Sequence, residues 1–213
     1  MVKLKICGVR RLIEAEAALA AGADFLGFVF YPPSPRYLTP PEARELVAEI
    51  RRAVDRADWA AVGVFVNEPA AWVNEVAALC ELDYVQLHGT ESAAYCGQMA
   101  RPVIKALRLA EIKGDPTRAS AYGAARLLLD SQVPGYWGGT GRRFDWEGAR
   151  LYAGEALVAG GLTPENVGEA LEVLQPWGLD VSSGVERGGV KDPTLIRAFL
   201  ENARRWEVAI HGD

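Results

Sequence analysis

Two loops near the end of the chain contain residues that could bind an anion. They comprise Gly160 and Gly161, which follow the apolar run 156–159, and Ser182, Ser183 and Gly184, which follow the run 179–181. Glycine allows the backbone to approach a ligand closely, and serine adds a hydroxyl donor. Either loop alone could be an ordinary tight turn. Two such loops in succession, each after a short strand, favour a phosphate site.

Three side chains that can exchange protons also follow predicted strands. Cys7 ends the first strand, His88 follows the fourth, and Asp130 ends the sixth. Cysteine is also common in protein cores, and aspartate often begins a turn. Their positions at strand ends favour acid–base chemistry for Cys7 and Asp130, whereas His88 could equally serve to orient its loop.

Two further segments could act on a substrate. Arg36 lies in the proline-rich loop 31–38, and a rigid loop suits bidentate binding of a carboxylate, although a solvated surface arginine is the alternative. The glycine-rich stretch 137–146 follows Asp130 and predicts a lid that excludes water. A disordered loop is the alternative there, but the aromatic residues Phe144 and Trp146 indicate that part of the stretch packs against the rest of the protein.

The alternation of short apolar runs with helical patterns predicts the scaffold. Strands are expected at 4–7, 25–30, 62–66, 84–87, 103–107, 127–129, 156–159 and 179–181. Helices are expected at 11–21, 40–54, 69–79, after Glu91, within 115–123, at 146–152, from Pro164 with Thr163 as N-cap, and at 193–204. Eight such units predict a single-domain (β/α)8 TIM barrel of parallel strands over residues 1–213. An open doubly wound sheet is the alternative, but no G-x-G-x-x-G motif follows the first strand.

Strand parity predicts one buried ion pair. Lys5 and Cys7 are two residues apart on one strand, so both face the barrel interior if either does. A buried lysine needs a partner, and barrel closure places the strand carrying Asp180 beside the first strand. We therefore expect a Lys5–Asp180 pair beneath the site, with Lys5 favouring the thiolate of Cys7.

Composition restricts the class of protein. The chain has 213 residues, 50% of them hydrophobic, and a formal net charge of −5, which argues against a nucleic-acid partner. No apolar run is long enough to cross a membrane, and three cysteines, an odd number without a CxxC pair, suggest a reducing cytoplasm. Arginine outnumbers lysine 18 to 5, and asparagine and glutamine total 8, which fits a thermophile. A homodimer is left open.

Six short motifs occur in order along the whole chain. They are K-I-C-G (5–8), S-P-R (34–36), Q-L-H-G (86–89), G-G-T-G-x-x-F-D-W (138–146), A-G-G-L (159–162) and D-V-S-S-G-V-E (180–186). Each motif alone is weak, but together they resemble the phosphoribosylanthranilate isomerases of tryptophan biosynthesis.

The resemblance implies an Amadori rearrangement of N-(5-phosphoribosyl)anthranilate to the corresponding deoxyribulose 5-phosphate. It implies that Cys7 is the general base and Asp130 the general acid, and that Arg36 binds the anthranilate carboxylate. The phosphate would lie at the two glycine loops, and proton transfer would need neither a metal nor an organic cofactor. To act as an acid, Asp130 must hold a proton, which burial and closure of the 138–146 lid would favour.

Two other functions remain as alternatives. The first is another phosphate-binding barrel enzyme of the same pathway, such as indole-glycerol-phosphate synthase or the α subunit of tryptophan synthase. Neither is expected to carry K-I-C-G on its first strand. The second is a non-catalytic phosphosugar-binding barrel, which would have no need for Cys7 and Asp130 at opposed strand ends.

Overall fold

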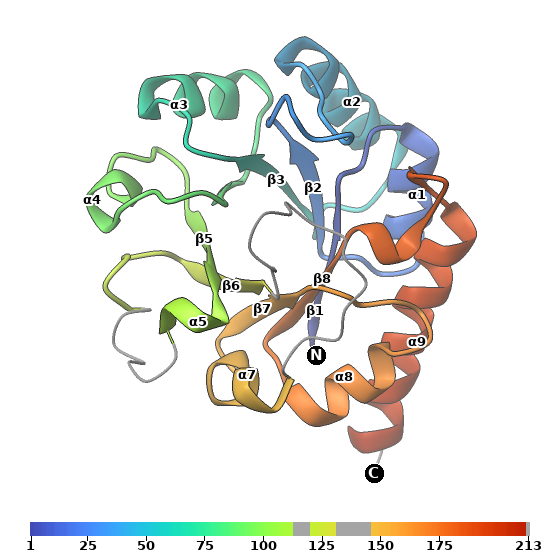
Figure 1. The fold of residues 1–213 in the computed structure, drawn as a ribbon. Coiled ribbons are helices and arrows are strands. Elements are labelled where there is room, and N and C mark those ends of the chain that lie inside the picture. Colours follow the sequence, from blue (N-terminus) through green and yellow to red (C-terminus); the bar gives the residue numbers. More distant parts are fainter. Residues whose placement is uncertain (113–119, 131–145, 212–213) are drawn as a thin grey trace.

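The computed structural model describes residues 1–112, 120–130 and 146–211, with side chains through Val208. Eight parallel strands pair in chain order and close into a barrel, as the sequence predicts (Figure 1). The strands are β1 (Lys3–Cys7), β2 (Phe25–Val29), β3 (Ala60–Phe65), β4 (Tyr84–Leu87), β5 (Val103–Arg108), β6 (Arg126–Asp130), β7 (Ala156–Ala159) and β8 (Gly178–Val181).

Helices surround the strands as a ring (Figure 1). They are α1 (Leu12–Ala20), α2 (Pro40–Ala53), α3 (Ala70–Leu79), α4 (Ala93–Cys96), α5 (Leu109–Ile112), α7 (Trp146–Ala153), α8 (Val167–Leu174) and α9 (Pro193–His211). After β8 the chain forms a short 3₁₀ helix, η1 (Ser183–Val185), and then a small hairpin of β9 (Glu186–Arg187) and β10 (Val190–Lys191).

Local sequence signals explain where several helices begin and end. Thr39 accepts a hydrogen bond from the Glu42 amide, and the Glu42 carboxylate accepts one from Thr39, so α2 begins with the expected capping box. The predicted start of α8 is wrong by three residues. Asn166 accepts from the Thr163 amide at 2.8 Å and donates to the Gly161 carbonyl oxygen at 2.8 Å, which forms a turn before the helix.

Other differences concern length. Helix α4 has a single turn, and α9 extends to His211, beyond the expected end at Arg204. The fifth helix was expected within 115–123, of which residues 115–119 lie outside the described part, while α5 directly follows β5. The predicted lid at 137–146 also lies outside the described residues, except for Trp146 at the start of α7.

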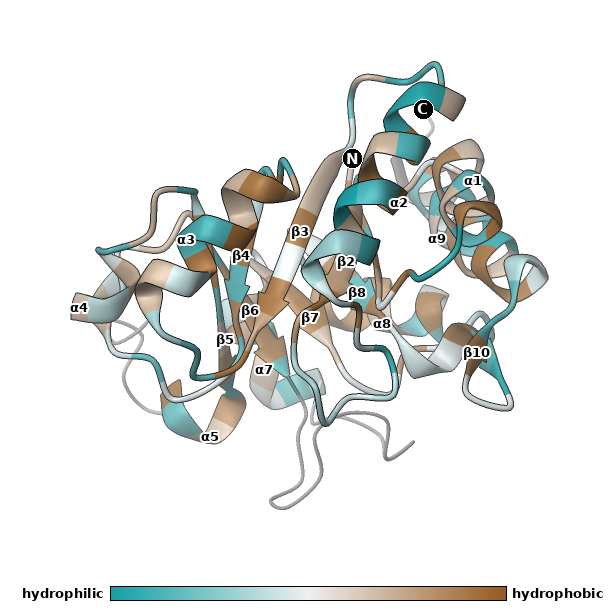
Figure 2. Ribbon diagram, turned by 90° about the horizontal axis from the view of Figure 1, so that it is seen from above, coloured by the Kyte–Doolittle hydropathy of each residue, from teal (hydrophilic) through white to brown (hydrophobic). Residues whose placement is uncertain are grey.

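Buried apolar residues form two layers, because alternate residues of each strand face the helices and the barrel interior. Most of the core lies between strands and helices, and in Figure 2 the strands are largely brown whereas the helices carry both brown and teal. A second cluster fills the barrel interior, with Phe25, Val62, Ile104, Leu128 and Leu157 among its members. The interior is therefore packed beneath the carboxyl ends of the strands, which leaves those ends to hold a site.

Candidate active site

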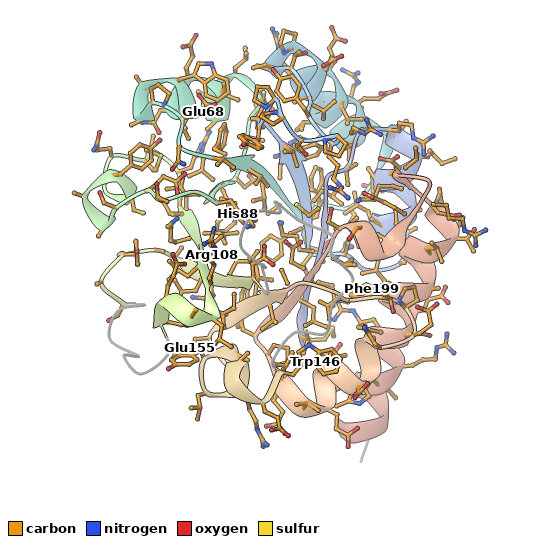
Figure 3. All side chains as sticks on the ribbon, viewed as in Figure 1. Glu68, His88, Arg108, Trp146, Glu155 and Phe199 are labelled. Carbon is orange, nitrogen blue, oxygen red and sulfur yellow. The ribbon has the colours of Figure 1, made fainter. Side chains whose placement is uncertain are left out.

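A pocket of about 210 Å³ lies at the carboxyl ends of the strands. Every site residue predicted from the sequence lines it except Lys5, which lies beneath. The lining comprises Cys7, Arg36, His88, Asp130, Gly160, Gly161, Asp180, Ser182, Ser183 and Gly184, with an apolar wall that includes Val29, Tyr31, Val64 and Val66. In Figure 3 the side chain of His88 lies near the middle of the ring of strands and helices. The pocket thus combines ionisable groups with a wall suited to an aromatic ring.

Cys7 is buried against the neighbouring strand. A Cβ atom added to Gly27 would lie 2.9 Å from the Cys7 sulfur, so glycine at this position of β2 makes room for the thiol. Burial raises the pKa of the Cys7 thiol, and Lys5 and Lys191 oppose this without cancelling it. Lys5 favours the thiolate, as expected, but loss of solvation and the nearby Asp180 outweigh the two lysines, so the net shift of the Cys7 pKa is upwards.

The predicted ion pair beneath Cys7 is confirmed. Lys5 and Asp180 are register partners across the β1–β8 seam, and Lys5 Nζ lies 3.0 Å from Asp180 Oδ1. Burial lowers the pKa of Lys5, but Asp180 and Cys7 raise it by more. The lysine therefore stays charged beneath the pocket, where its charge opposes the effect of burial on the thiol.

Asp130 and His88 are joined across the pocket. His88 Nε2 lies 3.1 Å from Asp130 Oδ2, and its Nδ1 lies 2.9 Å from the side-chain nitrogen of Gln86. Gln86 belongs to the Q-L-H-G motif, but no role was predicted for it. Since Gln86 and His88 are two residues apart, the parity rule used for Lys5 and Cys7 would have placed both in the interior.

A buried ion pair holds the loop that begins with His88. Lys105 Nζ lies 2.7 Å from Glu91 Oε2 and also donates to the carbonyl oxygens of Leu87 and Gly89. Glu91 in turn accepts hydrogen bonds from the amides of Asn67 and Gly89. Each charged atom therefore has several partners, which is the condition under which a buried pair fixes a single loop conformation.

The two predicted anion loops pack directly against each other. A Cβ atom added to Gly184 would lie 1.8 Å from the Leu162 carbonyl oxygen, so only glycine allows this approach. Gly160 and Gly161 have φ values of 102° and 65°, which other residues rarely adopt. The start of η1 and the Gly160–Leu162 loop therefore lie side by side in the pocket wall.

Ser182 differs from the other residues predicted to bind phosphate. Its hydroxyl donates a 3.0 Å hydrogen bond to the Cys7 carbonyl oxygen, and its own carbonyl accepts one from Lys191 at 3.1 Å. The first bond ties the loop after β8 to the end of β1, and the second ties it to β10. In this structure the Ser182 hydroxyl stabilises the loop, and the residue lines the pocket wall.

Arg36 makes a bidentate contact within the protein. Its Nε and Nη2 each lie 2.7 Å from a carboxylate oxygen of Glu186, and Lys191 pairs with the same carboxylate. Arg36 and Lys191 together hold the pKa of Glu186 at about 2, although burial acts in the other direction. Gly8 makes room for this arrangement, since an added Cβ would lie 2.5 Å from Arg36 Cδ. Glu186 and Lys191 were missed because their contacts depend on the hairpin that follows η1.

We expect Glu186→Gln to lower stability near neutral pH by about 3–5 kcal/mol, because it leaves two partly or fully buried cations without their carboxylate. The depressed pKa of Glu186 stabilises the fold above its unfolded value of about 4.5, and that contribution is lost as pH falls towards about 2. Urea unfolding of both proteins between pH 2 and pH 7 measures this. Equal stabilities at pH 7, or a difference that persists unchanged at pH 2, would contradict the expected role.

The described part of the chain offers no group of three or more histidine, cysteine or acidic side chains arranged to hold a metal ion. In the same residues no helix is both long and apolar enough to cross a membrane.

The closed barrel, with paired glycine loops after β7 and β8 and ionisable residues at the ends of β1 and β6, has the active-site architecture of a (β/α)8 barrel enzyme. The model of the N-(5'-phosphoribosyl)anthranilate isomerase family matches residues 4–202. The chain belongs to the N-(5'-phosphoribosyl)anthranilate isomerase family and is therefore an isomerase of tryptophan biosynthesis.

Individual relatives agree over nearly the whole length. The N-(5'-phosphoribosyl)anthranilate isomerase of Geobacter sulfurreducens is 45% identical over 210 residues, covering 97% of this chain and 100% of the relative. The solved isomerase of Thermotoga maritima is 38% identical with a TM-score of 0.85, covering 96% of this chain and 100% of that one. A solved isomerase in complex with reduced 1-(o-carboxyphenylamino)-1-deoxyribulose 5-phosphate is 36% identical, with a TM-score of 0.80 and the same coverage.

Proposed function

We propose that this pocket carries out the Amadori rearrangement of N-(5-phosphoribosyl)anthranilate with Asp130 as general acid and Cys7 as general base. The observation that supports this most directly is that both side chains line one pocket with the two glycine loops. They come from β6 and β1, so they can act on the substrate from different sides.

The proposed chemistry requires two proton transfers. Asp130 gives its proton to the furanose ring oxygen as the C1–O bond breaks, and the anthranilate nitrogen lone pair forms a C=N bond to C1. Cys7 then removes the C2 hydrogen as a proton, and the electrons of that C–H bond form a C1=C2 double bond while the C=N electrons return to nitrogen. The enolamine tautomerises to the ketone. Each positioned acid or base typically contributes about 10²–10⁴-fold to such a reaction.

The pocket offers a place for both anionic ends of the substrate. The phosphate is expected at the amides of Gly161, Ser183 and Gly184, at the start of η1 and in the loop after β7. The anthranilate ring would lie against the apolar wall near Val29 and Val64, with its carboxylate at Arg36. Because Glu186 holds two nitrogens of Arg36, this carboxylate would bind to a guanidinium that is already oriented.

Gly184→Ala tests the phosphate site. We expect inorganic phosphate to inhibit the enzyme competitively, and this inhibition to weaken at least tenfold in Gly184→Ala, because the new Cβ forces the two loops apart. Gly154→Ala is the matched control, since a Cβ there meets nothing within 4 Å. A crystal with sulfate bound, in which the Gly161, Ser183 and Gly184 amides point away from the anion, would exclude this site.

Arg36→Lys tests the carboxylate site. Charge is kept but the planar fork is lost, so we expect the KM to rise roughly 10- to 100-fold, the equivalent of one or two charged hydrogen bonds. The exposed Arg44→Lys on α2 is the control and should behave as the parent. An unchanged KM in Arg36→Lys would show that this residue serves only its contact with Glu186.

The activity itself is tested by mixing the protein with freshly prepared substrate and following the loss of anthranilate-type fluorescence. A phosphosugar-binding protein without activity would leave the fluorescence decay at the uncatalysed rate.

A homodimer, a cytoplasmic location and a thermophilic source remain predictions. Sedimentation at several protein concentrations tests whether the protein is a homodimer.

A further inference from the structure

A chain of three side chains leads from the barrel interior to Asp130. The Gln86 amide nitrogen lies 2.9 Å from His88 Nδ1, and His88 Nε2 lies 3.1 Å from Asp130 Oδ2. Gln86 is 1% exposed and lines the pocket. Its side-chain oxygen is buried and has no hydrogen-bond partner among the described residues. A buried acceptor without a donor is costly, so this oxygen needs an explanation.

The donors and acceptors of each group relate the amide orientation to the position of the ring hydrogen. An amide NH₂ group can only donate, so His88 Nδ1 must accept and cannot carry a hydrogen. The hydrogen of a neutral imidazole is then on Nε2, which donates it to Asp130. Asp130 accepts at that oxygen, so the orientation in the structure corresponds to a pair with no acid proton between Nε2 and Oδ2.

A pair that holds the acid proton between His88 Nε2 and Asp130 Oδ2 requires the opposite amide orientation. One additional proton between these two atoms gives either a carboxylic acid donating to Nε2 of a neutral imidazole, or an imidazolium donating to a carboxylate. In both forms Nδ1 carries a hydrogen, and that hydrogen needs an acceptor. Rotation of the Gln86 amide by half a turn exchanges its nitrogen and oxygen and supplies this acceptor. The oxygen that has no partner in one orientation is thus used in the other.

We propose that Gln86 is a positioning residue whose amide orientation follows the proton on the His88–Asp130 pair: nitrogen faces His88 when the pair is deprotonated, and oxygen faces it when the pair holds the acid proton. This inference rests on the proposed role of Asp130 as general acid. The two states differ by one proton, which is the proton that Asp130 gives to the furanose ring oxygen.

Other charged and titratable groups share the walls around the pair. They are Cys7, Tyr31, Arg36 and Asp180 in the main pocket, and Arg108 and Glu111 in a smaller adjoining one. Among the described residues Gln86 lies against Nδ1 of His88 and Asp130 against Nε2, so the amide of Gln86 is the contact that distinguishes Nδ1 with a hydrogen from Nδ1 without one.

Nitrogen NMR of the histidine ring tests this directly. The chain has two histidines, His88 and His211, so ¹⁵N-histidine labelling of His211→Gln leaves one reporter. At high pH we expect His88 Nδ1 to be unprotonated and Nε2 protonated. As pH falls, Nδ1 should gain a proton over the same range in which turnover rises along the high-pH limb.

Two variants separate positioning from mere support. In Gln86→Glu an acceptor faces Nδ1 at all times, so Nδ1 should stay protonated to a pH about one unit or more higher, and the high-pH limb of kcat should move with it. In Gln86→Met both hydrogen bonds are lost at similar volume, so kcat should fall about three- to tenfold with little change in KM. The exposed Gln98→Met is the control and should match the parent.

A His88 ring with the same tautomer and the same titration midpoint in the parent and in Gln86→Glu would overturn the proposal. A protonated Nδ1 in the parent at high pH would also overturn it. The spectrum of the His211→Gln protein needs no change at Gln86, so a folding defect in Gln86→Met does not prevent the test. The role of Asp130 is measured separately, because normal turnover of Asp130→Asn would remove the acid while leaving the ring spectrum interpretable.

Discussion

Cys7→Ala is expected to lower kcat about 10²–10⁴-fold and to change KM little, because the substrate keeps its phosphate and carboxylate contacts but loses the base. Burial raises the pKa of the thiol, so the parent should gain activity with increasing pH, through a range above the usual value of about 8.5 for a free cysteine. Steady-state kinetics by fluorescence across pH 6–10 measure both effects. The rising limb should be absent in Cys7→Ala.

The other two cysteines provide matched controls. Cys80 and Cys96 are buried in the layer between strands and helices, outside the pocket. Cys80→Ala and Cys96→Ala should reduce stability by the loss of packing but leave turnover and its pH profile unchanged. Near-normal turnover in Cys7→Ala would remove Cys7 as the base and leave His88 as the next candidate.

Asp130→Asn is the second large effect that we expect, again a loss of about 10²–10⁴-fold in kcat with KM nearly unchanged. Asparagine keeps the shape of the side chain but cannot give a proton to the ring oxygen, so the high-pH limb should disappear with the acid. The exposed Asp55→Asn is the control.

The double variant Cys7→Ala/Asp130→Asn should be little worse than the more damaging single variant, because the two proton transfers serve one reaction sequence. A fully multiplicative loss would show that the two groups act independently.

The parts of the site that follow from strand periodicity could be predicted from the sequence. The alternation of side chains places Lys5 with Cys7, and closure of the eight units places Asp180 beside them, which together give the observed pair. The same rule applied to β4 would have identified Gln86 from His88. These inferences need only the backbone geometry of a strand and the order of strands in a barrel.

Other features depend on contacts that no local pattern contains. Arg36 and Glu186 are 150 residues apart, and their pairing requires the hairpin after η1 to return over the loop after β2. The pKa of Cys7 depends on the balance between burial and two cations, and the sign of that balance is set by packing. The start of α8 depends on whether Thr163 or Asn166 makes the capping turn, since both residue types favour it.

The seam between β1 and β8 also has a consequence for how the enzyme is made. The Lys5–Asp180 pair and the Ser182–Cys7 hydrogen bond each join residues that are 175 positions apart. Contacts of such separation form against a large loss of chain entropy, so they tend to form late in folding. A nascent chain that still lacks β8 therefore has neither the Lys5–Asp180 pair beneath the thiol nor one of the two glycine loops. During refolding, helical content can return while the barrel is open, whereas the return of turnover marks the moment at which its first and last strands meet.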